Sequence, residues 1–322
     1  MAKKTPNIVK EIRNSPPQEI NYAYQKNISY SQMSIYRGCQ YRWKLQYKDK
    51  IKRFTSSIHT VFGTAIHEVM QHYLDVMYET SGANADKIDL EKLFQEKFIG
   101  EYQKQYKSNN SEHFSSAEEM REFFEDGIGI LNWFKKKRSK YFSKRGYHLV
   151  GCEIPITIAP NKMYNNVLYL GYLDVVMYNE KTNKFNIIDI KTSTRGWREQ
   201  DKKNEDKQFQ LLLYKQFFSE QYGIPLEDIN IEFFILKRKV LDWDDEKLMS
   251  PHQAYRVQTF TPPSGKIKIN RAKTAVNDFI NECFDSSGKI KEKNYPKSPS
   301  KWNCRFCAYS QDKKTCGEGI IY

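Results

Sequence analysis

The chain has 322 residues and carries 52 Lys plus Arg against 39 Asp plus Glu, which gives a formal net charge of +13. It contains no repeat of fixed period, no apolar run of about eighteen residues that would predict a membrane span, and no secretory signal near its start. We therefore expect a soluble, intracellular and cytoplasmic protein whose positive surface attracts polyanions.

The first part of the chain is expected to be mainly helical. Residues 1–28 show little periodicity and several turn formers, so they predict a flexible N-terminal arm. A helix is predicted from Ser31, a suitable N-cap, and a second after Gly63, where apolar residues recur at steps of three and four. A long helix is expected to begin near Ser116, because acidic residues follow it in the first turn. We place the boundaries of this helical part at about 29–146.

The pattern changes to strands after Gly146. Short runs of branched and aromatic residues predict three strands, followed by a helix and a further strand. This order predicts an α/β fold in which a mixed sheet is flanked by helices. We expect one domain, 29–322, with an α/β core at about 147–260 and a C-terminal helix and cysteine cluster at about 264–322. The strands are predicted at 149–158, 167–177, 185–190 and 229–236, and the helix at 205–222.

The densest group of basic residues is interleaved with aromatic ones between Trp133 and Phe142. A surface that follows a phosphate backbone has this composition. The solvated end of an amphipathic helix would have it as well. The candidate nucleic-acid-binding residues are Lys135, Lys136, Lys137 and Arg138.

One predicted strand ends in a charged pair. It reads FNIIDIKT and carries Asp189 and Lys191, which share a face because residues two apart on a strand do so. Asp174, in the GYLD of the preceding strand, is expected at the same end of the sheet. Two carboxylates beside one lysine suit a hard cation such as Mg²⁺ or Mn²⁺. A D-x-K tripeptide by itself would also fit a salt bridge or a turn cap.

Four further residues accompany this pair. His67 lies in GTAIH on the second helix, and Glu153 lies on the strand before Asp174. Gln210 and Tyr214, in QLLLY, are one helical turn apart, so both can face the same site. Taken alone, a histidine such as His67 is more often a core or surface residue than a metal ligand.

In this order, the motifs resemble the RecB-like branch of the PD-(D/E)XK nucleases, which includes CRISPR-associated exonucleases and AddB-type repair nucleases. The resemblance extends over about residues 29–316 and implies a restriction-endonuclease-like fold with a helical annex. One departure is Asp189, where many relatives carry Glu; this shortens the side chain without removing a metal ligand.

The resemblance also implies roles for individual residues. A divalent cation, Mg²⁺ or Mn²⁺, would be bound by carboxylates, and Lys191 would orient or deprotonate the attacking water and stabilise the developing charge. Gln210 and Tyr214 would position the substrate strand. The implied metal ligands are His67, Asp174, Asp189 and, through its carbonyl, Ile190. The implied catalytic residues are His67, Glu153, Asp174, Asp189, Lys191, Gln210 and Tyr214.

The last cysteines form C-x2-C-x8-C, which is a metal-thiolate spacing, and the absence of a secretory signal argues against disulfides. Cys39 is the candidate for a fourth thiolate. In the family that the chain resembles, one early cysteine and a late trio hold a [4Fe-4S] cluster, although the x8 gap here is longer than the family often shows; four thiolates would also bind zinc. Cys152 and Cys283 are interpreted as ordinary buried thiols. The implied cluster ligands are Cys39, Cys304, Cys307 and Cys316.

These patterns predict a metal-dependent DNA nuclease, an exonuclease on single strands or duplex ends, in repair, recombination or replication. The alternative is a non-catalytic DNA-binding or scaffold module of a helicase or recombination complex, but the intact Asp174, Asp189 and Lys191 favour an enzyme. No G-x-x-x-x-G-K-[ST] motif is present, so a helicase partner would be a separate chain. The Lys- and Asn-rich composition is compatible with an AT-rich bacterial or phage genome, and thus with a phage protein in the host cytoplasm.

Overall fold

The computed structural model describes residues 5–143, 145–242, 244–310 and 312–319. The chain divides into two compact units, each built from three separate segments. Unit 1 comprises Met1–Pro16, Ser56–Ile154 and Tyr172–Ser264, and unit 2 comprises Pro17–Thr55, Pro155–Gly171 and Gly265–Tyr322. Within the described ranges, no helix has both the length and the apolar character needed to cross a membrane.

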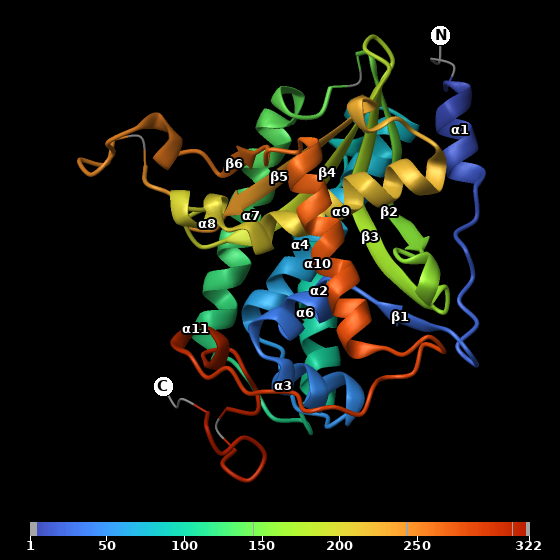
Figure 1. The fold of residues 1–322 in the computed structure, drawn as a ribbon. Helices are drawn as coiled ribbons and strands as arrows, with labels where there is room; N and C mark the ends of the chain where they lie inside the picture. The colour runs from blue at the N-terminus through green and yellow to red at the C-terminus, as the bar shows by residue number, and fades with distance from the viewer. Residues whose placement is uncertain (1–4, 144, 243, 311, 320–322) are drawn as a thin grey trace. The chain divides into compact units, whose positions relative to one another are not determined.

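The strands of the described residues form a mixed sheet with the order β1-β3-β4-β5-β6, in which β2 also pairs with β3 (Figure 1). The β3–β4 and β5–β6 pairs are antiparallel, and the β1–β3 and β4–β5 pairs are parallel. This mixed sheet flanked by helices confirms the predicted α/β, restriction-endonuclease-like class. The strands are β1 (Lys26–Ile28), β2 (Tyr147–Ile158), β3 (Val167–Asn179), β4 (Lys184–Ser193), β5 (Ile229–Lys237) and β6 (Val257–Phe260).

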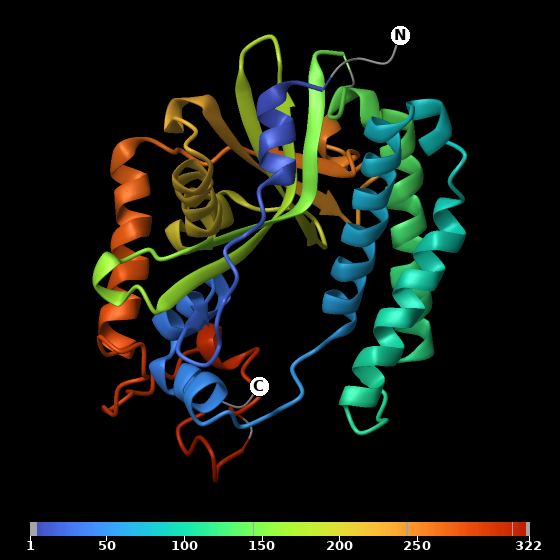
Figure 2. The same cartoon turned by 90° about the vertical axis from the view of Figure 1, so that its right-hand side faces the viewer.

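Helices cover both faces of the sheet in unit 1. In Figure 2, α9 lies on one side of β4 and β5, while α4, α6 and α7 lie on the other. Ile188 and Ile190 of β4 belong to the hydrophobic core formed with α4, α6 and α7. Because side chains alternate along a strand, Asp189 and Lys191 point to the opposite face, toward α9. The helices of unit 1 are α1 (Asn7–Asn14), α4 (Ile58–Glu79), α5 (Gly82–Ala85), α6 (Leu90–Ser108), α7 (Ala117–Lys137), α8 (Glu199–Lys203) and α9 (Glu205–Tyr222), with short turns η2 (Arg138–Lys140), η4 (Leu226–Asp228) and η5 (Pro251–Gln253).

The helix ends follow from local capping. The side chain of Ser57 accepts a hydrogen bond from the N–H of Thr60, so α4 begins before Gly63 rather than after it. Ser116 caps α7 as predicted, and α9 ends at Gly223, whose φ of 66° is the left-handed conformation of a C-cap glycine.

The N-terminal segment, expected to be a flexible arm, contains helix α1. Val9 and Ile12 of this helix are buried. Arg13 donates hydrogen bonds to the carbonyls of Leu149 and Val150 on β2, at 2.6 and 3.1 Å. These contacts hold α1 to the strand edge of unit 1.

Unit 2 is organised around Trp43, which is fully buried. Its ring packs against Tyr36, Phe279 and Tyr295 with centroids 5.7 Å away in each case. The first helix of this unit is capped by Ser29 and not by Ser31, because the Ser29 hydroxyl accepts from the N–H of Gln32. Unit 2 contains α2 (Tyr30–Gly38), α3 (Gln40–Trp43), the π-helical turn η1 (Lys44–Lys48), η3 (Lys162–Tyr164), α10 (Lys266–Cys283) and α11 (Lys301–Cys304).

Candidate active site

The candidate site in unit 1 lies where β3 and β4 stop pairing. Their antiparallel ladder ends at Val175 and Ile188, and the next residues beyond it are Asp174 and Asp189. At this fork, the N–H of Ile190 donates to Oδ2 of Asp174 at 2.7 Å. The end of the ladder therefore brings both carboxylates to one place.

Lys191 links the strand to α9. Its Nζ lies 2.8 Å from Oδ2 of Asp189 and donates to Oε1 of Gln210 at 2.9 Å. The amide of Gln210 in turn donates to the hydroxyl of Tyr214 at 3.2 Å. Gln210 and Tyr214 are one turn apart, while residues 211–213 between them are fully buried and anchor α9 on the sheet.

Helix α4 supplies two residues from the other side of the fork. Nδ1 of His67 lies 3.7 Å from Oδ2 of Asp174. Gln71, one turn further along α4, is buried and donates to Oε1 of Glu153 at 2.6 Å and to the carbonyl of Asp174 at 3.1 Å. Gln71 was not predicted from the sequence. The feature that could have indicated it is a polar amide side chain four residues after His67, within an otherwise apolar stripe of the helix.

Glu153 has an unusual backbone conformation for a strand residue. Its φ is 52°, in the left-handed region that costs a side-chain-bearing residue about 1–2 kcal/mol. The hydrogen bond from Gln71 holds its carboxylate beside Asp174. Strain of this kind persists where the surroundings enforce it, and it is common at functional sites.

Burial dominates the electrostatics of this group. Burial, together with the nearby Asp189, raises the pKa of Asp174 well above its ordinary value. Burial and the ammonium of Lys191 lower the pKa of His67 to about 4, so its imidazole is neutral at pH 7. Burial tends to lower the pKa of Lys191, but Asp189 and Asp174 outweigh it and raise that pKa. Lys191 is therefore a half-buried ammonium beside two carboxyl groups.

The carboxyl group of Asp189 is poorly satisfied. The residue is 1% exposed, and its Oδ1 accepts no hydrogen bond from any described residue. A buried carboxylate oxygen without a donor is costly, and a cation is the partner that would compensate it. Among the described residues, however, no group of three His, Cys, Asp or Glu side chains is arranged to hold a metal ion. The side chains that converge here are thus two carboxyl groups with raised pKa values, a neutral imidazole and an ammonium.

Four of the six cysteines come together in unit 2. Cys39, Cys304, Cys307 and Cys316 line a single cavity. Burial, together with the nearby Cys307 and Cys39, raises the pKa of Cys316. The amide of Asn303 donates to the carbonyl of Gly38 at 2.7 Å, which joins the two chain segments that carry these thiols.

The other two cysteines do not line that cavity. Burial raises the pKa of the Cys283 thiol to about 12, and the Cys152 thiol lies 3.9 Å from the carbonyl of Gln71. Both therefore have the surroundings of ordinary buried thiols.

The basic segment at the end of α7 is partly engaged in structure. Lys135 donates to the carbonyl of Asp86 at 2.6 Å, and Arg138 pairs with the carboxylate of Asp86 at 2.6 Å. Lys136 and Lys137 are exposed. The interleaved rings of Phe134 and Phe142 are buried in the core and cannot stack on a ligand.

Comparisons with known proteins connect this geometry to a family. The sequence matches the model of the PD-(D/E)XK nuclease superfamily over residues 27–311. A comparison with curated proteins found no match. Among solved structures, the crystal structure of SSO0001 aligns with 98% of this chain and 96% of its own, with a TM-score of 0.40 and 12% sequence identity. The family assignment rests on the sequence match.

Proposed function

This chain belongs to the PD-(D/E)XK nuclease superfamily, and from that premise we propose that it is a divalent-metal-dependent deoxyribonuclease of the RecB-like branch that acts as an exonuclease. A nuclease of this superfamily acts on DNA, and such enzymes generally use Mg²⁺ or Mn²⁺. The observation that carries the proposal is the fork between β3 and β4, where Asp174, Asp189 and Lys191 meet. The net charge of +13 is consistent with a polyanionic substrate.

The donor set fits a hard cation. Two carboxylates and a backbone carbonyl are the oxygen ligands that Mg²⁺ and Mn²⁺ take, and Oδ1 of Asp189 is a buried acceptor without a donor among the described residues. We propose Asp174, Asp189 and the carbonyl of Ile190 as ligands, with His67 beside them in its neutral form. When bound, the cation would supply positive charge beside the scissile phosphate and lower the pKa of water.

The remaining residues position the reactants. Lys191 donates one N–H to Gln210 and forms an ion pair with Oδ2 of Asp189 at 2.8 Å. An ammonium has three N–H donors, and we propose that one of the others donates to the attacking water or to a phosphate oxygen and stabilises charge that develops during cleavage. Gln210 and Tyr214 would then orient Lys191 and the substrate strand, and Glu153 would keep Asp174 in place through Gln71.

End-labelled DNA provides the test. Purified protein is incubated with single-stranded and double-stranded substrates in the presence of Mg²⁺, Mn²⁺ or EDTA. We expect cleavage with either metal, none with EDTA, and products released stepwise from an end. Asp189→Asn and Lys191→Ala should each lower the rate by orders of magnitude, whereas Glu125→Ala, an exposed acid on α7, serves as the matched control. Wild-type activity in both site variants would show that the proposed site is wrong.

We further propose that Cys39, Cys304, Cys307 and Cys316 hold a structural [4Fe-4S] cluster. The support is that these four thiols, out of six, line one cavity. Four thiolates can hold either a [4Fe-4S] cluster or zinc, and the resemblance to RecB-like nucleases is what favours the cluster.

Spectroscopy of anaerobically purified protein tests the cluster. We expect a brown protein with about four irons per chain, which loses colour and thermal stability in Cys39→Ala. Cys283→Ala, a thiol of the same unit outside the cavity, should keep its colour. A colourless protein with one zinc would overturn the iron assignment, and a Cys39→Ala protein that keeps its metal would remove Cys39 from the site.

The cellular role that we propose is DNA repair, recombination or replication alongside a separate helicase or recombination protein. It draws on the resemblance to RecB-like nucleases and on the lack of a P-loop motif in this sequence. Co-purification of the tagged chain with such a protein from the source cell would support this role, provided that an excess of untagged chain displaces the partner. Purification of the chain without a partner would count against it.

A further inference from the structure

A large groove lies in unit 1 at the carboxyl ends of β4 and β5. Its volume is about 1130 Å³. It is lined by the end of η2 and the residue after it, by α8 and the loop before it, and by β6 and the connection from β5 to β6. None of the described residues that line it is Asp or Glu. Its cationic residues are Lys140, Arg195, Lys202, Lys237, Lys239 and Lys247.

Most of these cations have no carboxylate partner. Lys202 pairs with Glu199 at 2.7 Å, and Lys239 pairs with Glu122 and Asp126 at 3.0 and 3.1 Å. For the other four, no ion pair exists within the part of the chain that the structure describes. Most of the cations of the groove are therefore not held in ion pairs, although Asp242, Asp244, Asp245 and Glu246 lie on the same loop as Lys247.

Lys237 shows this most clearly. It is 6% exposed, and its Nζ donates to the carbonyl of His252 at 2.6 Å. Burial, together with the nearby Arg256, lowers the pKa of Lys237. Holding an ammonium out of water without a counter-charge is costly, and an anion in the groove would offset that cost.

Aromatic rings lie among the cations. Tyr141 and Tyr255 line the groove, and the ammonium of Lys140 lies 5.5 and 4.9 Å from their ring centroids. Unpaired bases stack on such rings, whereas the bases of a duplex are already stacked on one another. Lysines beside half-buried rings that line the groove thus favour a single strand over a duplex as the ligand.

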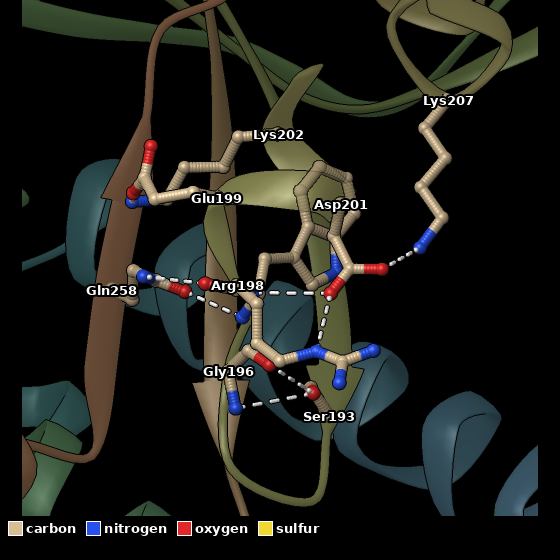
Figure 3. A network of polar contacts seen from close by, with 9 residues as sticks. Ser193, Gly196, Arg198, Glu199, Asp201, Lys202, Lys207 and Gln258 are labelled. Carbon is tan, nitrogen blue, oxygen red and sulfur yellow. Dashed lines mark hydrogen bonds and ion pairs between the residues drawn. The ribbon is translucent and has the colours of Figure 1, made fainter. Parts of the chain in front are cut away.

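The wall of the groove between β4 and α8 is held in place by hydrogen bonds (Figure 3). The side chain of Gln258, from β6, accepts from the N–H of Trp197 at 2.7 Å and donates to its carbonyl at 3.1 Å. Ser193 bonds both polar backbone groups of Gly196, whose φ is +92°. The loop that carries Arg195 is therefore pre-formed, so little ordering is needed on binding.

The groove and the candidate active site share the neighbouring strands β4 and β5. In the parallel pairing of β4 with β5, Lys191 lies opposite Ile235 and Ser193 lies opposite Lys237. Lys237 is therefore on the same face as Lys191 and two strand positions further on, about 7 Å along the strand. A chain bound at the catalytic fork would reach the groove directly.

We infer that this groove binds the phosphate backbone of single-stranded DNA and guides the strand to or from the candidate active site. That the strand is guided to or from the active site rests on the proposed nuclease function. That the groove binds a phosphate backbone rests on its cations without ion-pair partners. Arg195 and Lys247 are both exposed, so their side chains can contact phosphates without disturbing the core.

The test measures binding without cleavage. The affinity of wild-type protein for a fluorescein-labelled single strand is measured by anisotropy in EDTA over a range of salt concentrations. Arg195→Ala/Lys247→Ala removes two groove cations, and Lys92→Ala/Lys107→Ala removes two exposed cations of α6 as the matched control. Each phosphate contact on a single strand contributes about 0.7 to the slope of log K against log salt, so the groove variant should lose about 1.4 from that slope. The control should keep the wild-type slope.

An unchanged slope in the groove variant, or an equal loss in the control, would overturn the groove assignment. If a blunt duplex of the same length binds as tightly and loses the same slope, the single-strand preference is overturned. Cleavage of the same oligonucleotides with Mg²⁺ is scored separately. If the wild-type protein binds DNA through the groove but cuts none of the oligonucleotides, the proposed nuclease function is refuted and the groove assignment is kept. If it cuts DNA but the groove variant binds as the wild type does, the groove assignment is refuted and the nuclease function is kept.

Discussion

Gly127 of α7 lies directly against Phe94 of α6. A substitution at Gly127 therefore tests how closely α6 and α7 pack. A Cβ added at Gly127 would lie 2.3 Å from Cε1 and 2.4 Å from Cζ of Phe94. Carbon atoms in contact are about 3.5–4.0 Å apart, so the ring would have to move by about 1 Å or more. Phe94 is fully buried and stacks on Phe98 and Phe124 with centroids 5.4 and 5.7 Å away, which leaves it little room.

Gly100 of α6 provides a matched case, because a Cβ there would have nothing within 4 Å. Both glycines lie inside long helices, so alanine gains about 1 kcal/mol of helix propensity at either position. Overpacking a close-packed core costs about 1–3 kcal/mol. The propensity gain cancels between the two variants, and their unfolding free energies should differ by the overpacking cost of about 1–3 kcal/mol, with Gly127→Ala the less stable.

Urea denaturation followed by circular dichroism measures both free energies. We expect Gly100→Ala to unfold at higher urea than wild type and Gly127→Ala at equal or lower urea, with similar denaturant slopes. Equal stabilisation of both variants would refute the close contact between α6 and α7.

Three further predictions concern single side chains. Gln71→Ala should lower DNA turnover by about 10–100-fold, as loss of a residue that orients a metal ligand does, while the melting temperature changes little; His72→Ala, its exposed neighbour, should keep full turnover. Asp126→Ala leaves Arg238, whose side chain is 8% exposed, with only the exposed Glu122 at 3.2 Å in place of the buried carboxylate at 2.6 Å, and it should lower the unfolding free energy by about 3 kcal/mol in urea titrations. A loss no larger than that of the exposed Glu125→Ala would contradict the buried pair. Arg13→Ala should cost about 1.5 kcal/mol and speed amide hydrogen exchange in α1, an effect that the exposed Lys10→Ala should not share.

Much of the sheet and of the helix over the site was predictable because its signals are local. Alternating apolar residues and a left-handed glycine at Gly223 predict β3, β4 and α9 to within a few residues. Helix α6 was missed, although Leu90, Phe94, Phe98 and Tyr102 recur every four residues on its buried face. The signal was diluted by the Lys, Glu and Gln between them.

The non-local features could not be predicted in the same way. The strand β1 is only three residues long and exists because it pairs with β3 about 140 positions away. The Glu153 conformation and its contact with Gln71 depend on where α4 packs, which periodicity does not specify. The cationic groove likewise brings together residues that are far apart in the sequence, such as Lys140, Arg195 and Lys247, and local composition cannot show that they are neighbours.

The division of the chain has a consequence for how the protein is made. The segments of unit 1 are all synthesised by Ser264, so this unit can fold while the ribosome is still translating the remainder. Unit 2 takes its pieces from 17–55, 155–171 and 265–322, and it stays incomplete until the last of these emerges. Throughout that interval, Cys39 has no access to Cys304, which lies 304 − 39 = 265 residues later. The cysteine-lined cavity therefore cannot form until Cys304, Cys307 and Cys316 have been synthesised, well after the segments of unit 1.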